Sequence, residues 1–175
     1  MISDFIKGKK QYDYPPEIQV GIRLHRAIDN FTDTHPATKM INAFFSPRYR
    51  LYSGAFTDIV YDYFLANDDH EFENETALKD FATSSYKKMQ EYESLFPERF
   101  AKLFPYMQQQ DWLSNYRFPW LIEKSFGGLV HRSAYLTESV SAFNIFNTNV
   151  AEMKKHYAVF FPELKRFAAD TLKQF

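Results

Sequence analysis

The stretch PPEIQVGIRLHRAIDNFTDTHP, residues 15–36, decides the fold because its pattern indicates one long helix. Two prolines followed by Glu17 are typical of a first helical turn, where a missing backbone N–H does no harm and a carboxylate suits the positive end of the helix dipole. Apolar residues then occupy nearly every side of the helix, which is typical of an interior position. We therefore expect a buried helix that ends at about Asp33.

Helical periodicity continues through the rest of the chain, whereas strand signals are poor and only five glycines are present for tight turns. Pro162 predicts a kink or break beside Phe161, because proline cannot continue the backbone hydrogen bonds of a helix. The fold class expected is all-α, a single-domain helical bundle over residues 1–175. The further helices are expected at 36–45, 53–67, 74–95 with Asn74 as N-cap, 97–110, 118–130 and 133–175.

Composition excludes several classes of function. A net charge of −1 and a pI near 6.5 give no basic field for nucleic acid or an anionic membrane as partner. The absence of cysteine excludes disulfides, thiolate ligands and a cysteine nucleophile, and it fits a reducing cytosol. No apolar run approaches the length of a membrane span, and the chain does not begin like a signal peptide. We expect a cytoplasmic protein.

Acidic and histidine side chains recur at helical spacing inside these apolar segments. His25, Asp29 and Asp33 follow one another at intervals of four, so they form one stripe on the first long helix. Asp58 and Asp62 repeat the spacing on an aromatic-rich helix. Unpaired carboxylates in a dry core raise their pKa or destabilise the fold, so some positive charge must compensate them.

A divalent cation and Arg26 are the two compensations that the sequence offers. Imidazole and carboxylate ligands without any thiolate suit Mn²⁺ or Mg²⁺. Asp4 is a further candidate ligand in apolar surroundings. The alternative interpretation is a solvated acidic face with a core histidine satisfied by its neighbour.

The basic residues Lys7, Lys9, Lys10, Arg48 and Arg50 allow two interpretations. They form either an ordinary surface or a rim that binds phosphate beside the acidic site.

Three stretches of this chain resemble the acyl carrier protein phosphodiesterase family, also called acyl carrier protein hydrolase. They are HRAIDNFTDTHP at 25–36, DIVYDYFLA at 58–66 and DWLSNYRFPWLIEKSFGGLVHR at 111–132. The resemblance covers nearly the whole chain.

This resemblance implies a fold distantly related to the HD-type metal-dependent phosphohydrolases. It implies hydrolysis of the phosphodiester that joins 4′-phosphopantetheine to a serine of holo-acyl carrier protein, with Mn²⁺, Mg²⁺ or another divalent ion. The metal ligands implied are Asp4, His25, Asp29, Asp33, Asp58 and Asp62. With it we expect Asp29, Arg26 and Asp62 to be catalytic, and Lys7, Lys10, Arg48 and Arg50 to bind the substrate.

The chain departs from the family pattern in two places. Tyr63 stands where family members commonly have histidine, and the chain begins in the middle of what resembles the family's first helical region, so we expect a short N-terminal segment to be missing. Two alternative functions remain: an HD-like phosphohydrolase for a small phosphodiester or nucleotide, and a carrier-binding homologue with impaired catalysis. We further expect Asp29 and Asp58 to reach one shared ion or water, and some of these acids to take up protons near neutral pH.

Overall fold

The computed structural model describes residues 2–175, and within them it contains α-helices and short 3-10 helices but no strand. The expected all-α fold is confirmed. The 3-10 helices are η1 (Ile2–Phe5), η2 (Gly8–Asp13), η3 (Arg50–Tyr52) and η4 (Glu93–Leu95). The α-helices are α1 (Pro16–Thr34), α2 (Pro36–Tyr49), α3 (Ser53–Ala66), α4 (Glu75–Gln90), α5 (Glu98–Gln109), α6 (Trp112–Asn115), α7 (Pro119–Arg132) and α8 (Val140–Leu172).

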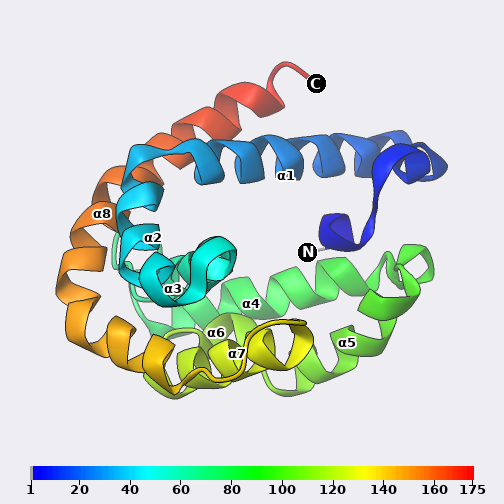
Figure 1. Ribbon diagram of the computed structural model, residues 1–175. Coiled ribbons are helices and arrows are strands. Elements are labelled where there is room, and N and C mark those ends of the chain that lie inside the picture. Colours follow the sequence, from blue (N-terminus) through cyan, green and yellow to red (C-terminus); the bar gives the residue numbers. More distant parts are fainter. Residues whose placement is uncertain (1) are drawn as a thin grey trace.

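Figure 1 shows these helices arranged as an open ring. The last part of α8 runs beside α1 at the top of the view, and α4 and α5 form the opposite side. The short helix η1 lies inside the ring, where it contacts both α1 and α5. The N-terminal segment is thus placed between elements that are distant from it in sequence.

The main hydrophobic core lies where α2, α3, α7 and α8 meet. The rings of Phe45, Phe56 and Phe126 are fully buried there, and their centroids lie 5.0 to 6.0 Å apart. Removing one such ring by substitution with alanine typically destabilises a protein by about 3–5 kcal/mol. This core fixes the position of α3, which carries two of the predicted site residues.

A second, smaller core joins α4, α5 and α6. It contains Tyr86, Phe100, Phe104 and Met107, and Phe5 of η1 packs against it with its ring centroid 5.8 Å from that of Phe100. The contact of Phe5 with this core holds η1 inside the ring.

The helices depart from the sequence-based expectation at four places. Helix α2 continues through Pro47 to Tyr49 instead of ending at residue 45, and α4 ends at Gln90 instead of residue 95, with η4 after it. The helix expected from residue 133 begins only at Val140, because Ser133 Oγ accepts a hydrogen bond from the Leu136 amide at 3.0 Å and stabilises a turn instead. The expected break at Pro162 does not occur, since α8 continues to Leu172 and curves around the ring (Figure 1). Packing of Phe160 and Leu164 against the rest of the molecule on either side of the proline stabilises the helix there.

The expected N-cap is confirmed, since Asn74 Oδ1 accepts a hydrogen bond from the Ala77 amide at 3.0 Å. None of the helices in residues 2–175 combines the length and the apolar character that crossing a membrane requires.

Candidate active site

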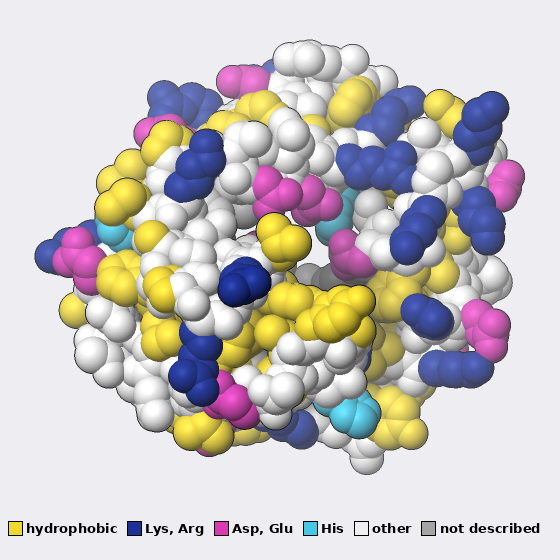
Figure 2. Space-filling model, in the orientation of Figure 1, with side chains coloured by type: hydrophobic (Ala, Val, Ile, Leu, Met, Phe, Trp, Pro, Cys, Tyr) yellow, Lys and Arg dark blue, Asp and Glu magenta, His cyan; other side chains and the backbone are white. Residues whose placement is uncertain are grey.

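A cavity of about 560 Å³ opens between η1, α1, α3 and α8. Figure 2 shows acidic side chains at the rim of the hollow in the middle of the molecule. We call this space the acidic cavity; among the residues that line it are all six of the predicted ligands, Asp4, His25, Asp29, Asp33, Asp58 and Asp62. The structure therefore brings together residues from three separate elements, while their role as metal ligands remains a prediction.

The tightest group within the acidic cavity consists of Asp4, His25 and Asp29. His25 Nδ1 lies 2.9 Å from Asp29 Oδ2, and His25 Nε2 lies 3.5 Å from Asp4 Oδ1. One potential ligand atom from each of the three residues lies within 4.8 Å of the others. Although Nδ1 is close to Asp29 and buried, it makes no hydrogen bond of regular geometry. Two carboxylate oxygens and an imidazole nitrogen at this range are a ligand set that one divalent cation can share.

Helix α3 places its apolar and acidic side chains on opposite faces. Phe56, Val60 and Phe64 recur every four residues and are buried in the main core. Asp58 and Asp62 are each offset by two residues, which is roughly half a turn of the helix. Packing of the apolar face therefore turns both carboxylates toward the acidic cavity.

Burial raises the pKa of Asp58 to about 7, and the negative charges of Asp33, Asp29 and Asp4 add to this effect. Burial and the charge of Asp58 likewise raise the pKa of Asp62 to about 7. Both residues are exposed where they face the acidic cavity. The shifts agree with the expectation that some of these acids take up protons near neutral pH.

Arg26 does not line the acidic cavity, which corrects its predicted position as the cation beside these acids. Its guanidinium donates hydrogen bonds to Gln11 Oε1 at 2.8 Å and to the Ile6 carbonyl at 3.0 Å. The next residue in a helix points about 100° away from the one before it. Arg26 is therefore directed away from the face of His25, and it ties α1 to the N-terminal segment.

The four predicted substrate-binding residues also lie outside the acidic cavity. Arg48 pairs with Glu138 through an Nε–Oε1 distance of 2.8 Å, and Arg50 is an exposed residue with a positive φ of 47°. Lys7 and Lys10 are exposed just after η1, on the segment that carries Asp4. Figure 2 shows Lys and Arg side chains gathered on the side of the view where Figure 1 places η2.

Tyr63, the departure noted on α3, packs against the main core. Its ring centroid lies 5.1 Å from that of Phe146 in an edge-to-face arrangement. Since Tyr63 is not among the residues that line the acidic cavity, its replacement of histidine leaves the six candidate ligands in place.

A neighbouring cavity of about 560 Å³ was not predicted from the sequence. We call it the arginine cavity; Arg99, Arg132, Trp112 and Tyr116 line it, and it shares Asp4 and Asp62 with the acidic cavity. The segments DWLSNY and GGLVHR supply three of these side chains. Both segments carry the family resemblance, and within them Trp112, Tyr116 and Arg132 are the sequence signal for this cavity.

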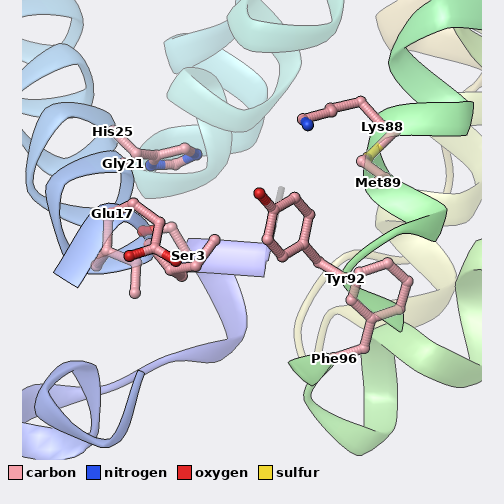
Figure 3. Close-up of a pocket in the computed structure, with 10 residues that line it drawn as sticks. Ser3, Glu17, Gly21, His25, Lys88, Met89, Tyr92 and Phe96 are labelled. Carbon is pink, nitrogen blue, oxygen red and sulfur yellow. The ribbon is translucent and has the colours of Figure 1, made fainter. Parts of the chain in front are cut away.

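A third, smaller pocket of about 290 Å³ lies on another side of His25. Figure 3 shows His25, Lys88 and Tyr92 pointing toward one another across it. Its other walls include Ile18, Ile22, Met89 and Phe96, so the lining is mainly apolar. The imidazole of His25 therefore separates an acidic space from an apolar one.

Comparison with known proteins places this arrangement in a family. A family model described as acyl carrier protein phosphodiesterase matches residues 1–164. An acyl carrier protein phosphodiesterase of Yersinia pestis is 29% identical over 168 residues, which cover 96% of this chain and 87% of the relative. A protein of the same name from Serratia proteamaculans (strain 568) is 26% identical over 170 residues, which cover 97% of this chain and 88% of the relative. No solved structure matches the chain. The chain belongs to the acyl carrier protein phosphodiesterase family.

Proposed function

We propose that this protein hydrolyses the phosphodiester between 4′-phosphopantetheine and a serine of holo-acyl carrier protein. Membership of the family supports the general activity. The observation that carries the proposal is the convergence of Asp4, His25 and Asp29 in a cavity that three further carboxylates line.

The residues of the acidic cavity fit a divalent ion such as Mn²⁺ or Mg²⁺. Asp4, His25 and Asp29 offer two carboxylates and an imidazole at close range, and Asp33, Asp58 and Asp62 supply further oxygen atoms elsewhere in the lining of the same cavity. This set of oxygen and nitrogen donors, without sulfur, is the kind that such ions prefer. A bound ion would supply a Lewis acid for the phosphoryl group and would make water a better nucleophile near neutral pH.

The charge of the cavity makes hydrolysis dependent on that ion. Five aspartates line the same space, and the mutual repulsion of their charges is visible in the raised pKa of Asp58. A phosphodiester carries a negative charge of its own, so an uncompensated cavity would repel it. The acids therefore bind the substrate only when a cation neutralises them.

Other residues of the cavity orient its groups and form the apolar part of its lining. Asp62 accepts a hydrogen bond from Tyr116, which holds its carboxylate at the wall shared with the arginine cavity. Phe160, Phe161 and Leu164 of α8 form an apolar wall opposite the acids.

The carrier protein has to approach this cavity from outside. Carrier proteins are typically acidic around the modified serine, so a basic surface near the site favours their association. Lys7, Lys9 and Lys10 are exposed on the segment that follows Asp4. We propose that this segment contacts the carrier, whereas Arg48 already has an acidic partner in Glu138.

The test is an incubation of holo-acyl carrier protein with the purified protein and Mn²⁺, followed by mass spectrometry of the carrier. Loss of the phosphopantetheine mass is expected from the natural sequence and not from Asp29→Ala. Asp80→Ala, at an exposed residue of α4, is the matched control and should keep full activity. A panel of small phosphodiesters and nucleotides tests the alternative substrate class. Hydrolysis of the panel without any reaction of the carrier would contradict the proposal.

A further inference from the structure

We propose that the arginine cavity binds the phosphopantetheine group of the substrate, with Arg99 and Arg132 at its phosphate and the apolar walls along its pantetheine chain. This inference rests on the proposed function and assigns the part of the site that holds the group to be released.

The position of the arginine cavity supports this assignment. It shares Asp4 and Asp62 with the acidic cavity, so the two spaces meet at a common wall. A phosphodiester that reacts at this wall has one substituent that leads to the carrier serine and another that leads to pantetheine. The carrier is a protein and stays outside, so the smaller substituent is the one that can enter a cavity of about 560 Å³.

The charges of the cavity complement a phosphate ester. Among residues 2–175 neither Arg99 nor Arg132 forms an ion pair or a side-chain hydrogen bond. Guanidinium groups recognise phosphate through paired N–H donors, and two of them match the charge of a phosphate monoester. Several other exposed cations are paired with acids, as Lys102 is with Glu98 at 2.6 Å.

Arg132 lines the arginine cavity together with Asp62 and Tyr116. Its positive charge acts to lower the pKa of Tyr116, against the larger effect of burial, and Tyr116 is hydrogen-bonded to Asp62. Arg132, Tyr116 and Asp62 are therefore neighbours at the common wall. A phosphate held by Arg132 would lie beside the acidic cavity.

The remaining walls suit the pantetheine chain. Phe100, Leu103 and Met107 of α5 and Trp112 and Leu113 of α6 line the cavity. Pantetheine combines a carbon that bears two methyl groups, several methylenes and two amides, so most of its surface is apolar. A mainly apolar pocket with a few polar groups is the usual form of a binding site for such a molecule.

The test measures binding of free 4′-phosphopantetheine, with inorganic phosphate and pantetheine as separate probes of its two halves. The chain has two tryptophans, so Trp120→Phe leaves Trp112 as the only one and makes its fluorescence a reporter of the cavity. In that background and with Mn²⁺ present, Arg99→Ala and Arg132→Ala should each raise the Kd for 4′-phosphopantetheine by about tenfold to a hundredfold. They should weaken phosphate binding similarly and leave pantetheine binding unchanged.

Two controls separate this cavity from the others. Arg166→Ala removes an exposed arginine of α8 that lines neither cavity, and it should leave every Kd unchanged. Leu103→Phe narrows the arginine cavity without adding a tryptophan, and it should weaken the binding of both pantetheine and 4′-phosphopantetheine. Gly21→Ala adds a methyl group to the apolar pocket of Figure 3, where no atom lies within 4 Å of it. This variant should bind pantetheine and 4′-phosphopantetheine with unchanged affinity.

The outcomes distinguish this inference from the proposed function. If neither arginine variant changes the Kd for 4′-phosphopantetheine, the inference is wrong even when the carrier is hydrolysed. If the arginine variants instead weaken binding of apo-acyl carrier protein alone, the arginines face the carrier and the inference is wrong. Binding that depends on both arginines, in a protein that does not hydrolyse the carrier, supports the inference and contradicts the proposed function.

Discussion

Asp4 Oδ1 lies 3.5 Å from His25 Nε2, although the two residues belong to different elements, η1 and α1. The contact exists because Phe5 packs on the second core and Arg26 holds the Ile6 carbonyl. The candidate metal site therefore depends on the docking of the N-terminal segment as well as on the ligands themselves. Three of the predictions below test the ligands, the charges around them and this docking.

Mn²⁺ should stabilise the folded protein if the acidic cavity binds it. A ligand present at a hundredfold excess over its Kd adds about 2.7 kcal/mol to the free energy of unfolding. For a chain of this length, that corresponds to a rise in Tm of roughly 5–10 °C. Differential scanning fluorimetry with millimolar Mn²⁺ should show this rise for the natural sequence and for Asp80→Asn, and little of it for Asp29→Asn or His25→Ala. If Mn²⁺ does not change the Tm of the natural sequence, the stripe of His25, Asp29 and Asp33 has a structural role and does not bind the ion.

Stability without metal should fall as the pH rises through the acidic range. Burial and neighbouring charges raise the pKa of Asp58 and of Asp62 to about 7, whereas the same groups in the unfolded chain lose their protons near pH 4. The folded state thus holds more protons than the unfolded state between about pH 4 and pH 7, so the free energy of unfolding decreases across this window and levels off above it.

Urea unfolding in the presence of a chelator, at several pH values from 4.5 to 8, measures this decrease. Asp58→Asn and Asp62→Asn should each reduce it, because an amide does not titrate. Asp80→Asn should retain it. If neither site variant changes the slope, the two carboxyls titrate at ordinary values and the account of their burial is wrong.

Much of the acidic cavity could be predicted because its determinants are local in sequence. Intervals of four residues place His25 with Asp29, and Asp58 with Asp62, on single helical faces that line one cavity. The prediction that the first long helix is buried is wrong, because Ile22 is the one buried residue of α1. Asp4 is predicted as a candidate ligand from its apolar surroundings and from the family resemblance. The sequence also predicts that the acids of α1 and α3 share one cavity, because burying uncompensated charge is costly.

The arginines could not be placed from such patterns. Arg26 follows a candidate ligand in sequence, but its partner is the Ile6 carbonyl, and only the tertiary path of the N-terminal segment brings the two together. Arg99 and Arg132 lie on α5 and α7, which belong to different cores, and they meet at one cavity only through the tertiary fold. Neither helical periodicity nor the spacing of a motif predicts that two such residues will line one cavity. The sequence pattern likewise does not predict that α8 continues through Pro162.

Arg26→Ala should reveal a positioning role. Loss of its hydrogen bonds to Gln11 and Ile6 should lower stability by about 1–3 kcal/mol and loosen η1, which carries Asp4. Hydrogen exchange should increase in residues 2–13, and the Mn²⁺ concentration needed for half-maximal activity should rise. High Mn²⁺ should restore the activity. A loss of activity that high Mn²⁺ does not restore, with unchanged exchange, would indicate a direct role at the phosphoryl group.

The paired glycines of α7 offer a matched test of the arginine cavity. A Cβ added at Gly128 would lie 3.2 Å from Arg132 Nη1, so the guanidinium has to move, whereas one added at Gly127 would make an ordinary contact of 3.8 Å with Ser139 Oγ. Replacing a glycine inside a helix by alanine stabilises the helix by up to about 1 kcal/mol. Both variants should be at least as stable as the natural protein, and only Gly128→Ala should bind 4′-phosphopantetheine more weakly. Equal affinities would show that the position of Arg132 does not matter.

The most direct test of the central claim follows the mass of holo-acyl carrier protein with purified protein, with Mn²⁺ and again after chelation. We expect conversion to the apo form with Mn²⁺, no conversion after chelation, and recovery when Mn²⁺ is returned. Asp29→Asn should remain inactive under all three conditions, with the helical content of the natural protein. Conversion that persists after chelation, or that Asp29→Asn performs at the natural rate, would contradict the claim that the cavity of Asp4, His25 and Asp29 is a metal-dependent phosphodiesterase site.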